Sequence, residues 1–132
     1  MDELNRMTLG ERELDVMAAL WEMKSGTVEE VRKRLPSKLA YTTVLTILRN
    51  LETKGFVSHE EEGRAHRYAP RVAQRSAQRN AVARMVAKFF GGSPEALVAR
   101  LVDDNELSAE ELRRLARTIS GQRRNRGKGG GR

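Results

Sequence analysis

Cysteine is absent from this chain of 132 residues. Without cysteine the protein has no disulfide framework, no cysteine-ligated zinc and no cysteine nucleophile. No apolar run approaches the roughly 20 residues of a transmembrane helix, and the acidic N-terminal stretch lacks the apolar segment of a secretory signal. These absences favour a cytoplasmic protein that does not insert into a membrane.

Residue groups that carry catalysis are also lacking. The two histidines, His59 and His66, have no serine and carboxylate at the spacing of a catalytic triad. No glycine-rich loop follows a strand, which is the context of a phosphate-binding loop. A metal site built on the two histidines would need further ligands. We therefore expect neither an enzyme nor a bound metal or cofactor.

Basic charge is present in excess and is unevenly distributed. The net charge is +7; residues 32–84 hold 12 basic and 4 acidic residues, and residues 121–132 hold 5 basic and none acidic. By contrast, residues 1–31 have a net charge of −5 and residues 85–120 of −1. A charged run alone is compatible with a solvated surface. Two basic blocks in one short chain favour a polyanionic partner.

Two helices are expected at the start of the chain. Helical spacing of apolar residues predicts the first over about residues 9–24, with Thr8 and Glu11 forming a capping box at its start. Thr27 and Glu30 repeat this pattern and begin a short second helix, which a proline ends.

A third helix and a hairpin follow. The helix is expected over about residues 42–54, with Val44, Leu48 and Leu51 on one face, and Gly55 stands where a helix-ending glycine belongs. The runs FVSHE and AHRYAP alternate apolar and polar residues around a turn that contains glycine, which predicts a β-hairpin. Three helices followed by a hairpin is the order of a winged helix-turn-helix fold.

The rest of the chain is expected to be helical up to residue 120, with Ser93 and Pro94 at the start of one helix and a capping box of Ser108 and Glu111 at the start of the last. We therefore predict a mainly α fold with a small β-hairpin, in which residues 1–71 form a winged-helix DNA-binding domain and residues 72–120 a helical dimerisation domain. Residues 121–132 are expected to be a disordered basic tail. The C-terminal helices are too few to build a good core alone, so their apolar stripes predict a homodimer. The predicted dimerisation residues are Val82, Val86, Phe89, Phe90, Leu97 and Leu101.

A helix-turn-helix unit places its second helix in the major groove. The exposed side of the third helix and the hairpin therefore hold the predicted DNA-binding residues, which are Tyr41, Thr42, Thr43, Thr46, Arg49, Arg64, His66 and Arg67. Simpler roles stay open: Thr42 as a helix cap, Arg49 as a solvated residue, and the hairpin tip as polar only because it is exposed.

Several segments together resemble the penicillinase-repressor family of winged-helix regulators, the BlaI/MecI type, which is related to copper-responsive CopY repressors. The segments are LGERELDVMAALWE, TVEEVRKRL, YTTVLTILRNLETKGFV, EEGRAHRYAP and ALVARLVDDNELSAEELRRL, within residues 8–120. The resemblance implies a homodimeric repressor that binds a palindromic operator of double-stranded DNA and controls β-lactamase or related resistance genes. It also implies relief of repression by a membrane sensor protease that cleaves within the dimerisation helices.

This chain departs from the family pattern at two points. The pair aligned with the cleaved Asn-Phe is Arg100-Leu101, and the cysteine motif of the copper-responsive relatives is missing. A different class of function also stays open: a winged-helix scaffold for protein contacts, with the basic tail as a separate non-specific nucleic-acid arm.

Overall fold

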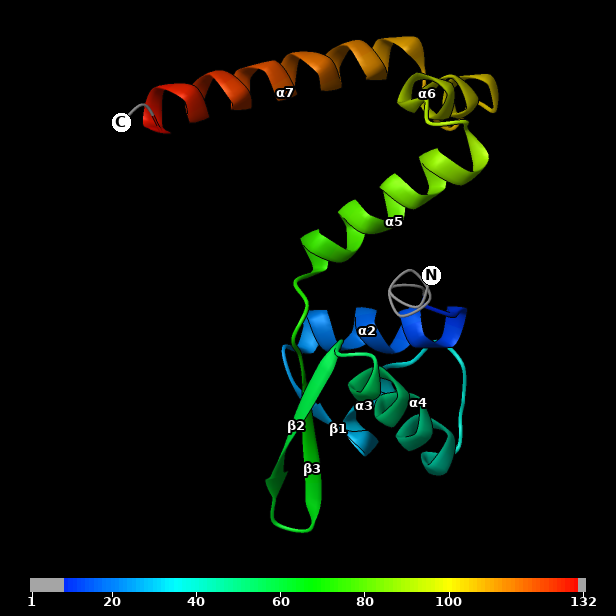
Figure 1. Cartoon of the computed structure of the whole chain (residues 1–132), viewed down its shortest axis with the longest axis vertical. Helices are drawn as coiled ribbons and strands as arrows, with labels where there is room; N and C mark the ends of the chain where they lie inside the picture. Colours follow the sequence, from blue (N-terminus) through cyan, green and yellow to red (C-terminus); the bar gives the residue numbers. More distant parts are fainter. Residues whose placement is uncertain (1–8, 131–132) are drawn as a thin grey trace. The chain divides into compact units, whose positions relative to one another are not determined.

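The computed structural model describes residues 9–130, with side chains as far as Arg123 (Figure 1). Of the nine helices and strands that the structure describes, eight were expected in kind and order from the sequence. The elements in chain order are α2 (Glu11–Met23), β1 (Gly26–Thr27), α3 (Val28–Arg34), α4 (Tyr41–Thr53), β2 (Val57–Glu62), β3 (Ala65–Pro70), α5 (Gln74–Phe89), α6 (Pro94–Asp103) and α7 (Ala109–Gly130).

The expected mainly α fold with a hairpin is confirmed, and one strand is added to it. The sheet has the order β1-β3-β2, and all its pairs are antiparallel. Strand β1 pairs Gly26 with Tyr68 and Thr27 with Arg67. Sequence analysis missed β1 because two residues cannot display an alternating pattern, and only the pairing with β3 makes them a strand.

One apolar core joins α2, α3 and α4 to the sheet. Tyr68 of β3 and Val57 of β2 are buried beside the apolar faces of the three helices. The stripe of Val44, Leu48 and Leu51 expected on α4 is fully buried. The core also contains Val16, Met17, Leu20, Val28, Val31, Ile47 and Phe56.

The first two helices begin differently. At α3 the expected capping box is confirmed: the Glu30 amide donates to Thr27 Oγ1 at 3.2 Å, and the Thr27 amide donates to Glu30 Oε1 at 3.1 Å. At α2 the cap residue is Gly10, whose amide donates to Glu13 Oε1 at 2.9 Å. The helix therefore begins at Glu11, two residues later than the expected capping box of Thr8 and Glu11 places its start. Thr8 itself lies outside the described residues.

The C-terminal helices have the expected starts. The Ala96 amide donates to Ser93 Oγ at 3.1 Å, and Pro94 is the first residue of α6. At α7, Ser108 and Glu111 form the expected capping box, with hydrogen bonds of 2.8 and 3.0 Å. Helix α7 continues to Gly130, which differs from the disordered tail expected from residue 121. Backbone hydrogen bonds within a helix are local, so this extension needs no buried face.

The chain divides into two compact units between Ala83 and Arg84, inside α5. The beginning of α5 thus groups with the winged helix. The boundary after residue 71 that the sequence suggests stays a prediction: it proposes that residues 1–71 form the DNA-binding domain. Among the described residues, no helix is both long enough and apolar enough to cross a membrane.

Helix α4 ends in a Schellman motif that turns the chain into the hairpin. The Phe56 amide donates to the Leu51 carbonyl at 2.9 Å and the Gly55 amide to the Glu52 carbonyl at 3.0 Å, while Gly55 has a φ of +88°. This left-handed conformation is favourable for glycine and costly for residues with a Cβ atom. Gly55 therefore sets the direction in which the hairpin leaves α4.

We expect Gly55→Ala to lower the free energy of unfolding by about 1 kcal/mol, because alanine disfavours the left-handed conformation. No atom lies within 4 Å of a Cβ added here, so the loss has no steric part. Denaturant unfolding measures it. Gly55→Asn is the control and should lose less, since asparagine adopts this conformation more readily. Equal stability of wild type and Gly55→Ala would contradict the assigned role.

Candidate nucleic-acid interface

Helix α4 has one buried and one exposed side. Its buried side carries the apolar stripe described above, and Tyr41, Thr42, Thr46 and Arg49 are exposed, whereas Thr43 is half-buried. Four of the five residues predicted to face DNA on this helix thus have exposed side chains. The hydrophobic core determines which side of α4 is free for a partner.

The threonines at the start of α4 are not needed as caps. The cap residue is Ala40, and no side chain satisfies the first amides of the helix. Within the described residues the hydroxyls of Thr42 and Thr43 form no hydrogen bond, while Thr46 Oγ1 donates to the Thr42 carbonyl at 2.9 Å. The alternative that Thr42 acts only as a cap is therefore wrong. Free amides at a helix start favour an anion such as phosphate.

The hairpin of β2 and β3 is the wing of the fold. Its register pairs Glu62 with Ala65, which leaves Gly63 and Arg64 as a two-residue turn, and Gly63 has a φ of +62°. Arg64 is exposed at this tip and, in the part of the chain that the structure describes, has no ion pair. Its guanidinium is therefore available to a partner.

A cleft of about 170 Å³ lies between α4 and the wing. Two arginines, a phenol and an imidazole line it together with two apolar side chains, and none of the described residues that line it is acidic. Planar guanidinium groups bind phosphate oxygens through paired hydrogen bonds. The cleft thus brings together four of the predicted DNA-binding residues in a setting suited to a phosphate. The lining residues are Val28, Tyr41, Leu45, Arg49, Arg64 and His66.

A contact that sequence analysis missed connects the wing to the end of α4. The ring of His66 stacks on His59, with ring centres 4.4 Å apart and an interplanar angle of 16°. His59 Nδ1 lies 2.8 Å from both carboxylate oxygens of Glu52 in α4. Among the described residues no group of three potential metal ligands occurs. Through Glu52, the stacked rings connect one face of the wing to the end of α4.

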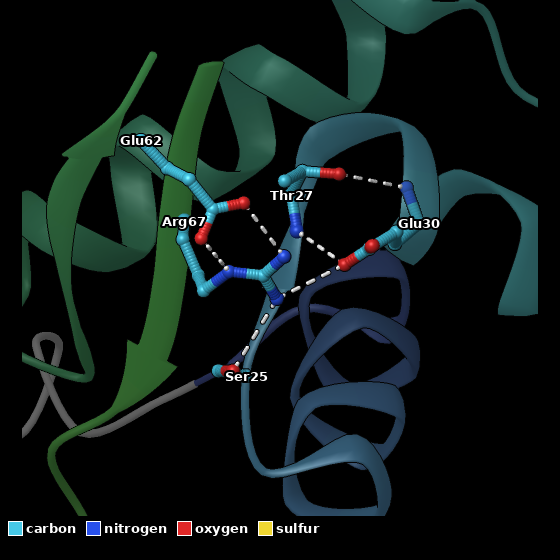
Figure 2. Close-up of polar contacts among 5 residues, drawn as sticks. All are labelled: Ser25, Thr27, Glu30, Glu62 and Arg67. Carbon is cyan, nitrogen blue, oxygen red and sulfur yellow. Dashed lines mark hydrogen bonds and ion pairs between the residues drawn. The ribbon is translucent and has the colours of Figure 1, made fainter.

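Arg67 lies on the opposite face of the wing from His66, because neighbouring residues of a strand point to opposite sides. Its guanidinium pairs with Glu62 through two hydrogen bonds of 2.9 and 3.0 Å. It also donates to Glu30 Oε1 at 3.1 Å and to Ser25 Oγ at 3.4 Å (Figure 2). The structure thus separates Arg67 from the cleft residues with which sequence analysis grouped it.

The charges of this network reinforce one another. The carboxylates of Glu62 and then Glu30 raise the pKa of Arg67. Hydrogen bonds from Arg67 lower the pKa of Glu62. The pKa of Glu30 is lowered first by the Thr27 amide and then by Arg67. All three side chains are therefore charged at neutral pH, and Glu30 serves both the start of α3 and the wing.

Comparison with known proteins gives consistent matches. The family model of penicillinase repressors matches residues 9–121. The penicillinase repressor of Bacillus licheniformis is 28% identical over 109 residues, covering 81% of this chain and 85% of that protein. The transcriptional regulator BlaI of Mycobacterium tuberculosis is 45% identical over 65 residues, which is 47% of each chain.

Two solved structures are also similar. The solution structure of the DNA-binding domain of the repressor BlaI is 33% identical, with a TM-score of 0.47, and covers 51% of this chain and 84% of that domain. The monomeric form of Bacillus licheniformis BlaI, in complex with the blaP half-operator, is 32% identical, with a TM-score of 0.46, and covers 52% of this chain and 87% of that one.

The family match extends over most of the chain, from the first described helix to the middle of α7. It agrees with the resemblance inferred from the sequence motifs. The family consists of DNA-binding transcriptional repressors, and its members are not enzymes. This chain belongs to the penicillinase repressor family.

Proposed function

We propose that this repressor binds a palindromic operator as a homodimer, with α4 of each copy in the major groove. The observation that carries the proposal is the cleft between α4 and the wing, where basic side chains from both elements meet beside the free start of α4. The complex of a related BlaI monomer with a half-operator supports it. In a bacterial cell such a repressor acts in the cytoplasm, where the operator lies.

Base contacts and phosphate contacts fall to different residues in this proposal. Thr43 and Thr46 lie in the first two turns of α4, where a recognition helix approaches base edges. Their hydroxyl and methyl groups suit contacts with bases and with the thymine methyl group. Tyr41, Arg49, Arg64 and His66 line the cleft and suit the DNA backbone, which positions the protein without selecting a sequence. Thr42, exposed beside the helix start, belongs to the second group.

The proposed dimer follows from the unpartnered apolar side chains of the second unit. Among its described residues only Val86 is buried. An apolar surface of this size is unfavourable in water unless a partner covers it, and a second copy offers the same stripes. Of the predicted dimerisation residues in this unit, Phe89 is 81% exposed; Val82, which precedes the unit in α5, is 51% exposed. Other large apolar side chains exposed there are Met85, Leu101, Leu115 and Ile119.

The regulated genes are proposed from the relatives, whose names point to penicillinase and therefore to β-lactamase or related resistance genes. Cleavage by a membrane sensor protease is the corresponding proposal for induction. Here Arg100 and Leu101 lie inside α6, so a protease could reach this bond only after local unwinding.

We expect Thr43→Ala and Thr46→Ala to weaken binding to the cognate operator by about 1–3 kcal/mol and to relax base preference at one position of each half-site. Titrations of cognate and random duplexes measure the ratio of the two affinities. Thr53→Ala is the control: Thr53 Oγ1 donates to the Arg49 carbonyl at 3.0 Å, the same local bond as in Thr46, but at the far end of α4. An unchanged ratio of cognate to random affinity in both Thr43→Ala and Thr46→Ala would contradict base contacts by α4.

We expect Leu101→Asp to yield monomers, because an unpaired charge in an apolar interface costs several kcal/mol. Sedimentation at micromolar concentration measures the oligomeric state. Ala99→Asp introduces the same charge at an exposed position on the other side of α6 and should leave the dimer intact. A monomeric wild-type protein under these conditions would refute the dimer.

A second candidate is a scaffold for protein contacts with a separate nucleic-acid arm. It is favoured by one observation: residues 122–132 lie beyond the family match and contain five basic and no acidic residues. We expect removal of residues 121–132 to weaken binding to all duplexes similarly, with a slope of log K against log salt reduced by about 0.9 for each lost phosphate contact. If truncation abolished duplex binding altogether, the scaffold would be favoured over the operator-binding proposal.

A further inference from the structure

The wing is held to the helices by different contacts on its two faces. On one face, His66 stacks on His59, which Glu52 of α4 holds. On the other face, Arg67 joins Glu62 at the end of β2 to Glu30 in the first turn of α3. The second connection shares its carboxylate with the capping box of α3.

We propose that Arg67 positions the wing for DNA binding and does not itself contact DNA. The proposal rests on the function proposed above, and it concerns how Arg64 at the wing tip is held at the cleft. The bridge from Glu62 through Arg67 to Glu30 fixes the tip relative to the helix-turn-helix unit.

The charges around Arg67 disfavour a phosphate contact. Two carboxylates, Glu62 and Glu30, surround the Arg67 guanidinium at 2.9 to 3.1 Å. The group of three side chains has a net charge of −1, so it repels a phosphate. Its hydrogen bonds to Glu62, Glu30 and Ser25 use four of the five guanidinium N–H groups, so a paired contact with a phosphate would require breaking at least one of them. Arg64 has no such competitor among the described residues, which makes it the better partner for the backbone.

The third strand of the sheet reaches only the base of the wing. Strand β1 pairs only with Arg67 and Tyr68 of β3, so the hairpin beyond these residues has two strands. A two-stranded ribbon is marginally stable and twists easily. Arg67 stands where the third strand ends, and its side chain reaches Glu62, the last residue before the tip. The bridge therefore stiffens the segment that carries Arg64.

The sign of one charge change separates positioning from direct contact. Glu62→Gln removes a negative charge, which by electrostatics alone strengthens binding to DNA. If Arg67 were a phosphate ligand, the change would also free it and strengthen binding further. If Arg67 positions the wing, the loss of its partner weakens binding. Glu61→Gln is the matched control, because it removes the same charge from the face of the wing opposite Arg67.

We expect Glu62→Gln to weaken binding to the cognate operator severalfold and Glu61→Gln to leave it unchanged or strengthen it. Full-length protein is titrated into operator and random duplexes at several salt concentrations, and melting curves verify that each variant is folded. Stronger binding by Glu62→Gln would overturn the proposal. Because Glu62 is exposed, this test stands even if variants of Arg67 unfold.

A second comparison uses the tip arginine as a background. Arg67→Lys keeps the charge but loses the two-pronged pairing with Glu62. We expect it to weaken binding and to reduce the salt slope by about 0.9, the contribution of the Arg64 contact. In an Arg64→Ala background the same change should have no further effect on affinity or slope. Additive effects would show that Arg67 acts independently of Arg64 and would overturn the positioning proposal. Sequence-specific binding by the wild type would in that case still support the proposed function.

Discussion

Burial of one side of α4 is the constraint on which the rest of the structure depends. Val44, Leu48 and Leu51 are fully enclosed by α2, α3 and the sheet, and burying such side chains contributes about 1.5–3 kcal/mol each. Rotation of α4 about its axis would expose this stripe. The opposite side, with its threonines and Arg49, is therefore held toward solvent by the core and needs no contact of its own.

The wing is fixed to the same core at its base and by polar contacts nearer its tip. Tyr68 and Val57 are buried with the helices, so the start of β2 and the last part of β3 lie in apolar surroundings. Toward the tip the supports become a histidine stack on one face and the ion pairs of Arg67 on the other. This gradient from apolar to polar support fits a segment that must remain soluble yet keep a defined direction.

The second unit shows the reverse balance between buried and exposed apolar groups. Helices α5 and α6 have apolar residues at helical spacing, but Phe89 in this unit, and Val82 just before it in α5, remain exposed within the described chain. In the winged helix the stripes of three helices meet one another and the sheet. A short helical unit has too little interior to bury its own stripes, which is the physical basis for proposing a second copy.

Local sequence patterns were enough to predict the helices, the hairpin and the capping boxes at Thr27 and Ser108, because these depend on periodicity and on residues three positions apart. The patterns also predicted the exposed side of α4, since a 3.6-residue period separates the two sides of a helix. Folding alone reveals that Gly26 and Thr27 form a strand, that Glu52 supports the stacked histidines, and that Arg67 faces carboxylates and not the cleft. These features join residues distant in the chain, and their contacts exist only once the core has brought the hairpin against the helices.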